Sequence, residues 1–154
     1  MAEERDLELE DVCPNLKKLS YKITSPLDHR YNCIAFAVGD LTHFWYDVNV
    51  NGYYWPPGVP SADTLIGWTK VFEIHGYVET GDRDLEPDYE KIAIYASSDT
   101  AEHVARQKAS GIWTSKIGKS VDIEHTLEEL EGDFYGKVVK VMKRKCLDGR
   151  RVLE

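Results

Sequence analysis

The segment Arg30–Leu41 combines a cysteine with the pattern of a helix start. Apolar residues recur there at the spacing of one buried helical stripe, at Ile34, Ala37, Val38 and Leu41. Asn32, a good N-cap residue, precedes this stripe and places Cys33 in the first turn. Unpaired backbone N–H groups and the helix dipole stabilise a thiolate at that position, and the same N–H groups can hold an oxyanion. The segment predicts a nucleophilic Cys33, and the competing interpretation is a small buried cysteine in a core helix.

The composition is that of a globular protein. With 154 residues, 42% of them hydrophobic, we expect one domain over residues 1–154 with residues 1–12 flexible. The net charge of -8 opposes binding to nucleic acid or to an anionic membrane. The sequence has no run of about eighteen apolar residues, and its acidic N-terminus lacks a signal core. We therefore expect a cytoplasmic protein, or one exported without a signal peptide.

The cysteines are widely spaced, at Cys13, Cys33 and Cys146. Their odd number and spacing predict free thiols in a reducing compartment. No pair of cysteines or histidines shows the spacing of zinc ligands, so we expect no metal and no other cofactor.

Aromatic residues alternate with glycines and prolines across residues 43–60. This composition does not fit a regular element, and aromatic side chains on loops often line binding pockets. The pattern favours a binding wall at Tyr53, Tyr54 and Trp55 as much as a rigid cover over the core.

The rest of the chain changes from a helical spacing of apolar residues to the alternating spacing of strands. A second helix is expected after Ser61 as N-cap, with its end near Gly76. Strands are expected at 77–79, 91–96, 102–107, 112–118 and 135–144, with a short acidic helix at 123–132. Helices followed by an antiparallel sheet of about four to five strands predict an α+β fold.

The order of these motifs resembles the NlpC/P60 and CHAP branch of the papain-like cysteine hydrolases. The resemblance rests on Cys33 within Tyr31–Ala37, on His103 within Glu102–Arg106, and on the glycine hairpin and third strand that follow. It covers about residues 28–144 and implies a papain-like core with N-terminal helices packed on the sheet. It also implies that Cys33 is the nucleophile and His103 the base.

The third catalytic position departs from that family's pattern. The family usually places a His, Asn, Asp or Glu on the strand after the hairpin, where this chain has Trp113–Lys116. Ser115 is the expected third residue because its hydroxyl can accept a hydrogen bond from an imidazole. Strand register decides whether Ser115 or Lys116 faces His103. The further alternatives are Asp122, Glu124 and His125.

Two functions follow from these patterns. The first is a thiol hydrolase or acyltransferase, in which Cys33 attacks the amide, ester or thioester carbonyl of a peptide or small amide and His103 protonates the leaving group. Asn32 and the aromatic residues of the loop would then contact the substrate. The resemblance implies amide bonds of cell-wall peptides. The second is a non-catalytic binding module that uses the loop 43–60 to hold a ligand or a protein partner.

Overall fold

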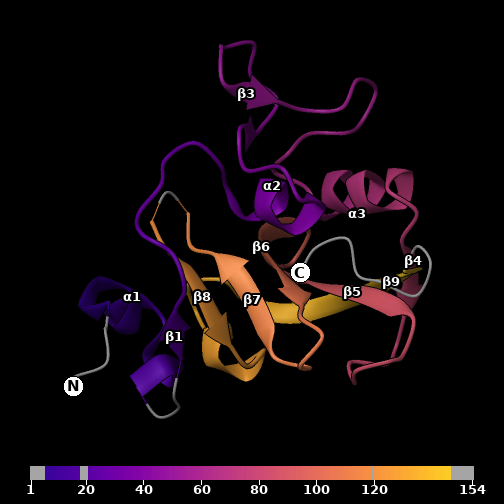
Figure 1. The fold of residues 1–154 in the computed structure, drawn as a ribbon. Coiled ribbons are helices and arrows are strands. Elements are labelled where there is room, and N and C mark those ends of the chain that lie inside the picture. The colour runs from indigo at the N-terminus through magenta and orange to yellow at the C-terminus, as the bar shows by residue number, and fades with distance from the viewer. Residues whose placement is uncertain (1–5, 18–20, 119, 147–154) are drawn as a thin grey trace.

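The computed structural model describes residues 6–17, 21–118 and 120–146. The longer strands are β5 (Tyr89–Ser97), β6 (Thr100–Gln107) and β9 (Lys137–Lys145), and the shorter ones are β1 (Lys22–Ile23), β4 (Val78–Thr80), β7 (Trp113–Lys116) and β8 (Asp122–His125). Together they form one antiparallel sheet in the order β1-β8-β7-β6-β5-β9-β4 (Figure 1). The remaining pair, β2 (Phe44–Trp45) and β3 (Tyr53–Tyr54), lies outside this sheet.

The helices of the described residues are short. They are α1 (Leu7–Val12), α2 (Cys33–Val38) and α3 (Leu65–Ile74), with 3-10 turns η1 (Pro14–Lys17) and η2 (Glu128–Leu130). The predicted α+β papain-like core is therefore wrong: the molecule is mostly β, with a seven-stranded sheet in place of a helical layer on four to five strands. None of these helices has the length and apolar character needed to cross a membrane.

The acidic helix predicted at 123–132 is also wrong. Residues Asp122–His125 form β8, which pairs along its whole length with β7, and only Glu128–Leu130 turns as a 3-10 helix. Ile123 and His125 are fully buried. The ladder to β7 and this burial outweigh the local helix preference of the acidic residues, which is a weak determinant by itself.

Several predicted boundaries also shift. Gly39, with φ of 94°, ends α2, so Leu41 lies beyond the helix and is 48% exposed. The cap of α3 is Thr64 and not Ser61, because the Thr64 hydroxyl accepts the Gly67 N–H at 3.0 Å. Residues 7–12, expected to be flexible, form α1, while residues 1–5 lie outside the described residues.

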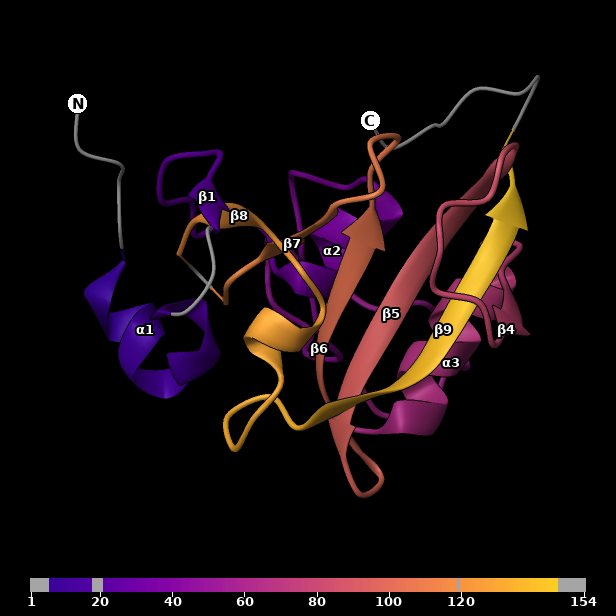
Figure 2. The same cartoon turned by 90° about the horizontal axis from the view of Figure 1, so that it is seen from below.

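The two faces of the sheet carry separate hydrophobic clusters. The helices α2 and α3 cover one face and lie behind the sheet in Figure 2. This cluster contains the buried side chains of α2 and α3 together with Ile92, Ile94, Val104 and Met142. On the other face, residues of α1, η1 and η2 pack with Ala93, Tyr95, Ala105 and Val141. Because side chains alternate along a strand, neighbouring residues of β5 and β6 belong to different clusters.

Candidate functional site

Cys33 occupies the first turn of α2, as predicted. Asn32 is the N-cap, and its Oδ1 accepts the Ala35 N–H at 3.2 Å. The thiol, however, is buried in the cluster between α2 and the sheet. Burial raises the pKa of Cys33 to about 12, although backbone N–H groups of Val104, Ile34 and Cys33 itself oppose the rise. The side chain is therefore a protonated thiol at neutral pH, in contrast to the thiolate that the helix start predicts.

The position of the sulfur follows from a divergence between two strands. β6 pairs with β7 only at Arg106–Thr114 and Gln107–Trp113, so residues 100–105 of β6 lack a β7 partner. Val104 lies in that unpaired part, and its backbone N–H favours the thiolate form of Cys33. The sulfur therefore lies against a part of β6 that β7 does not pair with.

His103 faces the other side of the sheet. Its neighbour Val104 packs under α2, whereas the His103 ring stacks on Tyr135, with 4.2 Å between ring centroids. Burial, and then the nearby His125, hold the pKa of His103 well below its usual value. No hydrogen bond joins His103 to Cys33 in the described part of the chain. The sheet separates the two residues, so the expected nucleophile and base are not brought together.

Ser115 makes a pair with a different histidine. The His125 Nδ1–H donates to the Thr126 carbonyl at 2.8 Å, because a carbonyl only accepts, and this leaves Nε2 as an acceptor. The Ser115 hydroxyl donates to that Nε2 at 2.7 Å. Both side chains are fully buried, and burial lowers the pKa of His125 to about 4. This interior pair is a satisfied hydrogen bond without access to a substrate.

The remaining candidates for the third position contact other groups. The Lys116 ammonium lies 4.2 Å from the centroid of the Tyr31 ring, Asp122 accepts the Tyr31 hydroxyl at 2.8 Å, and Glu124 pairs with Lys108 at 2.7 Å. None of these three contacts reaches His103.

The segment 43–60 stands on the outer side of α2 and α3, away from the sheet (Figure 1). Asn32 ties it to α2, because its Nδ2 donates to the Trp45 carbonyl at 2.9 Å and its Oδ1 accepts the Trp45 N–H at 3.2 Å. Asn32 is 9% exposed. Its amide therefore positions the segment, whereas the sequence predicts a substrate contact.

A cavity of about 400 Å³ lies between this segment and the end of α3. It is lined by Asp40, His43, Trp45, Tyr54, Pro56, Ile74 and His75. We call it the aromatic pocket, since the Tyr54 and Trp45 rings meet edge to face with centroids 4.9 Å apart. Of the three aromatic residues predicted to bind, only Tyr54 lines it. Tyr53 packs on Phe44, and the Trp55 indole donates to the Pro60 carbonyl at 3.1 Å.

Comparison with protein-family models identifies one family that matches most of this chain. The model of a domain of unknown function, DUF7689, matches residues 22–143. The chain belongs to the DUF7689 family. No curated protein and no solved structure matches it. The matched range contains the whole aromatic pocket and all of the sheet except the end of β9, so the DUF7689 domain includes the pocket and most of the sheet.

Asp40 organises the pocket wall of the DUF7689 domain. Its Oδ2 accepts the Trp45 Nε1–H and the His43 Nδ1–H, each at 2.9 Å. Its Oδ1 accepts the backbone N–H and the hydroxyl of Thr42, each at 2.8 Å. Burial by itself would raise the pKa of Asp40, but hydrogen bonds from Trp45, Thr42 and His43 outweigh it and hold that pKa at about 2. The carboxylate is therefore ionised at neutral pH.

The two pocket histidines share one arrangement. The Nδ1–H of His43 donates to Asp40, and that of His75 donates to the Val71 carbonyl at 2.8 Å. Neither Nε2 atom has a hydrogen-bond partner among the described residues. These residues contain no group of three His, Cys, Asp or Glu side chains placed to hold a metal ion.

Sequence reasoning missed Asp40 and His75, and it included His43 in the loop 43–60 without naming it as a binding residue. The signal for Asp40 was its position two residues before Thr42, because an aspartate often accepts the backbone N–H two residues on. His75 carried no comparable local signal, since its place in the pocket depends on how the end of α3 meets Trp45, with ring centroids 5.8 Å apart.

Proposed function

We propose that this domain is a binding module whose aromatic pocket takes a cationic group, such as the guanidinium or ammonium of a peptide side chain or of a small amine. The observation that carries the proposal is the ionised Asp40 carboxylate directly behind the indole and imidazole of the pocket wall. The volume of about 400 Å³ falls within the range of small-ligand sites.

The pocket wall supplies two kinds of contact to a cation. The faces of Trp45 and Tyr54 attract a positive charge, an interaction worth about 0.5 to 2 kcal/mol. The Nε2 atoms of His43 and His75, whose Nδ1–H groups donate to Asp40 and to the Val71 carbonyl, can accept hydrogen bonds from the N–H groups of guanidinium or ammonium. Asp40 has both oxygens occupied by the chain's own donors, so its charge acts through the pocket wall and not by direct contact.

The pocket is also built in advance of binding. The hydrogen bonds to Asp40 fix the Trp45 indole and the His43 ring, and α3 fixes His75. Fixed side chains lose little conformational entropy when a ligand arrives. A net charge of -8 for the whole chain further favours a cationic ligand over an anionic one.

The test uses two probes of the same shape, N-butylguanidinium and neutral N-butylurea. We expect the guanidinium to shift the NMR signals of the Trp45 indole N–H and of the His43 and His75 rings, with a Kd of about 1 mM for a ligand of this size. Equal shifts with the urea, or shifts confined to other residues, would overturn the proposal.

A matched pair of variants tests the pocket itself. Tyr54→Ala should weaken guanidinium binding about tenfold, because one aromatic face is lost. Tyr53→Ala removes the neighbouring ring, which packs on Phe44 outside the pocket, and should leave binding unchanged. Similar losses of guanidinium binding in both variants would show that the substitutions disrupt the fold of the segment 43–60 and do not simply remove a ligand contact.

Thiol chemistry at Cys33 is a second candidate function, favoured by its place in the first turn of α2, where backbone N–H groups lower the pKa of the thiol. It needs a base other than His103 and an opening of the core, since the side chain is 8% exposed. Incubation with p-nitrophenyl acetate, followed by mass spectrometry, tests it. Acetylation of Cys33 that is lost in Cys33→Ser would support this candidate, and its absence would overturn it.

A further inference from the structure

The strand β9 is paired on one side along its length but on the other side only in part. β5 pairs with it from Lys137 to Lys145, with one irregularity. β4 pairs only with Val141–Lys143 and ends at Thr80. Among the described residues, Lys137–Lys140 therefore form an open edge of the sheet, and an open edge is a template for a further strand.

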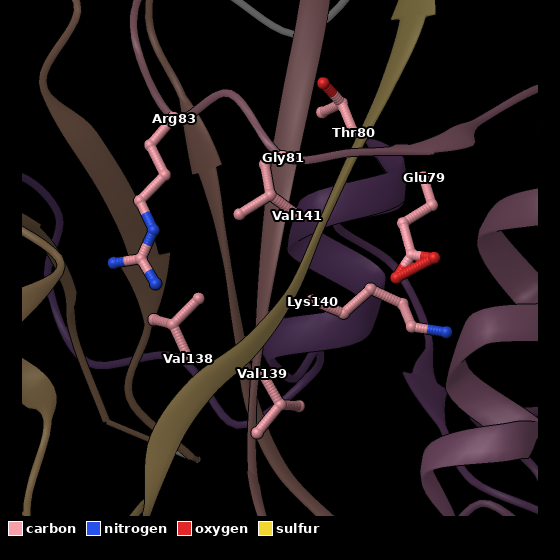
Figure 3. Close-up of a pocket in the computed structure, with 8 residues that line it drawn as sticks. All are labelled: Glu79, Thr80, Gly81, Arg83, Val138, Val139, Lys140 and Val141. Carbon is pink, nitrogen blue, oxygen red and sulfur yellow. The ribbon is translucent and has the colours of Figure 1, made fainter.

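A cavity of about 460 Å³ lies beside this open edge. Its walls are the end of β4, Arg83, and residues 138–141 of β9 (Figure 3). Figure 3 shows the Arg83 and Lys140 side chains on opposite sides of β9. Lys140 also lines a neighbouring depression formed by α3, where Ile66 is 71% exposed. The edge is thus flanked on both faces by long cationic side chains and by exposed apolar groups.

Charge compensation differs between the two halves of β9. Toward the end of β9, Lys143 pairs with Glu86 at 3.0 Å and Arg144 pairs with Glu90 at 2.8 Å. Along the open half, Lys137, Lys140 and Arg83 have no carboxylate within 4.0 Å in the described part of the chain. Uncompensated cations are therefore concentrated at this edge of a chain whose net charge is -8.

One contact within the chain shows that a carboxylate can bind the backbone of this edge strand. The Val138 N–H donates to the Glu131 carboxylate at 3.0 Å. A carboxylate thus already binds a backbone N–H at the start of β9. Lysines at an edge also discourage pairing between identical chains, because their charges repel. An acidic segment avoids this repulsion.

We propose that Lys137–Lys140 bind an extended, acidic segment of another protein, which adds to the sheet antiparallel to β9 and in line with β4. Main-chain hydrogen bonds to the groups of β9 other than the Val138 N–H, which Glu131 accepts at 3.0 Å, supply affinity, as in other cases of strand addition. Carboxylates of the segment contact Lys140 on one face and Arg83 on the other, and its apolar side chains cover Val139, which is 48% exposed. This surface is distinct from the aromatic pocket, and the partner has the opposite charge.

The first experiment uses the full chain and a fluorescein-labelled peptide of four Glu-Val repeats. We expect binding by fluorescence anisotropy, and we expect slower amide exchange at Lys137–Lys140 with no change at Val78–Thr80. A peptide of four Lys-Val repeats should bind at least about tenfold more weakly. Equal binding of the two peptides, or protection elsewhere, would overturn the proposal.

A second probe separates strand addition from simple charge attraction. N-methylation of alternate residues of the Glu-Val peptide keeps its charges and removes the N–H groups that a ladder needs. Binding should then fall at least about tenfold. Undiminished binding would overturn strand addition. A dimer of the protein through the same edge, detected by sedimentation and by protection of Lys137–Lys140 without peptide, would overturn the choice of partner.

Variants of the protein complete the test. The double variant Arg83→Glu with Lys140→Glu should lower affinity for the Glu-Val peptide at least about tenfold. The matched control is the double variant Lys22→Glu with Lys145→Glu, two exposed lysines away from the open edge, which makes the same change in net charge and should change affinity less than about twofold. Equal losses of peptide affinity in the variant and its control would show that binding depends only on the net charge of the protein. That result would contradict the proposal.

Discussion

The interior group of Cys33, His103 and His125 and the aromatic pocket contain similar residue types in opposite environments. In the interior, each side chain is buried and its nearest groups are ring faces, backbone N–H groups or a serine hydroxyl. In the pocket, His43 and His75 are held by Nδ1 and keep Nε2 without a partner among the described residues. The comparison teaches that a chemically capable residue type indicates function only when its reactive atom is accessible.

Burial disfavours the charged form in both regions, but hydrogen bonds outweigh it in only one of them. It raises the pKa of Cys33 and lowers that of His103, and each shift disfavours the charged form that catalysis by a thiolate and imidazolium needs. In the pocket, hydrogen bonds overcome burial and keep Asp40 ionised. Charge is therefore excluded from the interior group and maintained beside the pocket.

The largest expected effect concerns the reactivity of Cys33. Its pKa rises from 9.0 to about 12, so the native protein should contain about a thousandfold less Cys33 thiolate than the unfolded chain at the same pH. Alkylation by iodoacetamide, followed by mass spectrometry with and without urea, should show at least that reduction in rate. Rapid alkylation in the native protein, lost in His103→Ala, would contradict the comparison and restore the predicted catalytic pair.

The failure to predict this separation has a physical reason. The strands at 91–96, 102–107 and 135–144 were predicted from their composition and match β5, β6 and β9 closely. The face that His103 occupies, however, depends on register, because a shift of one residue turns every side chain over. The ladder between β5 and β6 has an irregularity at Tyr95 and Ala96 that no local pattern in the sequence reveals.

The start of α2 was predictable because it depends on local chemistry. The Asn32 cap and the position of Cys33 follow from residue types next to each other in the chain, and both are confirmed. The aromatic pocket was predicted in part, through Tyr54. Its other members come from the end of α2, the loop after it and the end of α3, so only the tertiary fold brings them together.

The next effect concerns stability in acid. The pKa of His125 is about 4 in the folded protein and 6.5 in the unfolded chain, so the unfolded state binds more protons between these values. The stabilisation is complete above pH 6.5 and is lost as the pH falls to about 4. It amounts to about 3 kcal/mol from His125, and His103 adds to it in the same direction.

Urea unfolding at a series of pH values measures this loss. His125→Gln cannot take up the proton and should give a smaller decrease in the free energy of unfolding between pH 6.5 and 4. A wild-type protein equally stable at both pH values would contradict the buried, neutral state of these histidines.

The smallest expected effects are changes in the free energy of unfolding of three histidine variants, two in the interior and one in the pocket. His103→Ala removes a ring that stacks on Tyr135 in the core, and the resulting cavity should cost about 2 kcal/mol of unfolding free energy. His103→Leu fills most of that space and removes the Nε2 atom, which is buried without a hydrogen-bond partner in the described structure. We expect it to cost less than about 1 kcal/mol, because an unsatisfied polar atom destabilises the fold.

The matched pocket variant is His75→Ala, which removes a half-buried ring from the pocket wall. It should cost less than about 1 kcal/mol, because the ring lines an open pocket and its removal leaves no closed cavity in the core, yet it should weaken guanidinium binding because one Nε2 acceptor is lost. His103 would then affect the stability of the fold, and His75 would affect ligand binding. If His103→Leu costs as much as His103→Ala, the ring itself is required at that position, and the interior group has a role beyond packing.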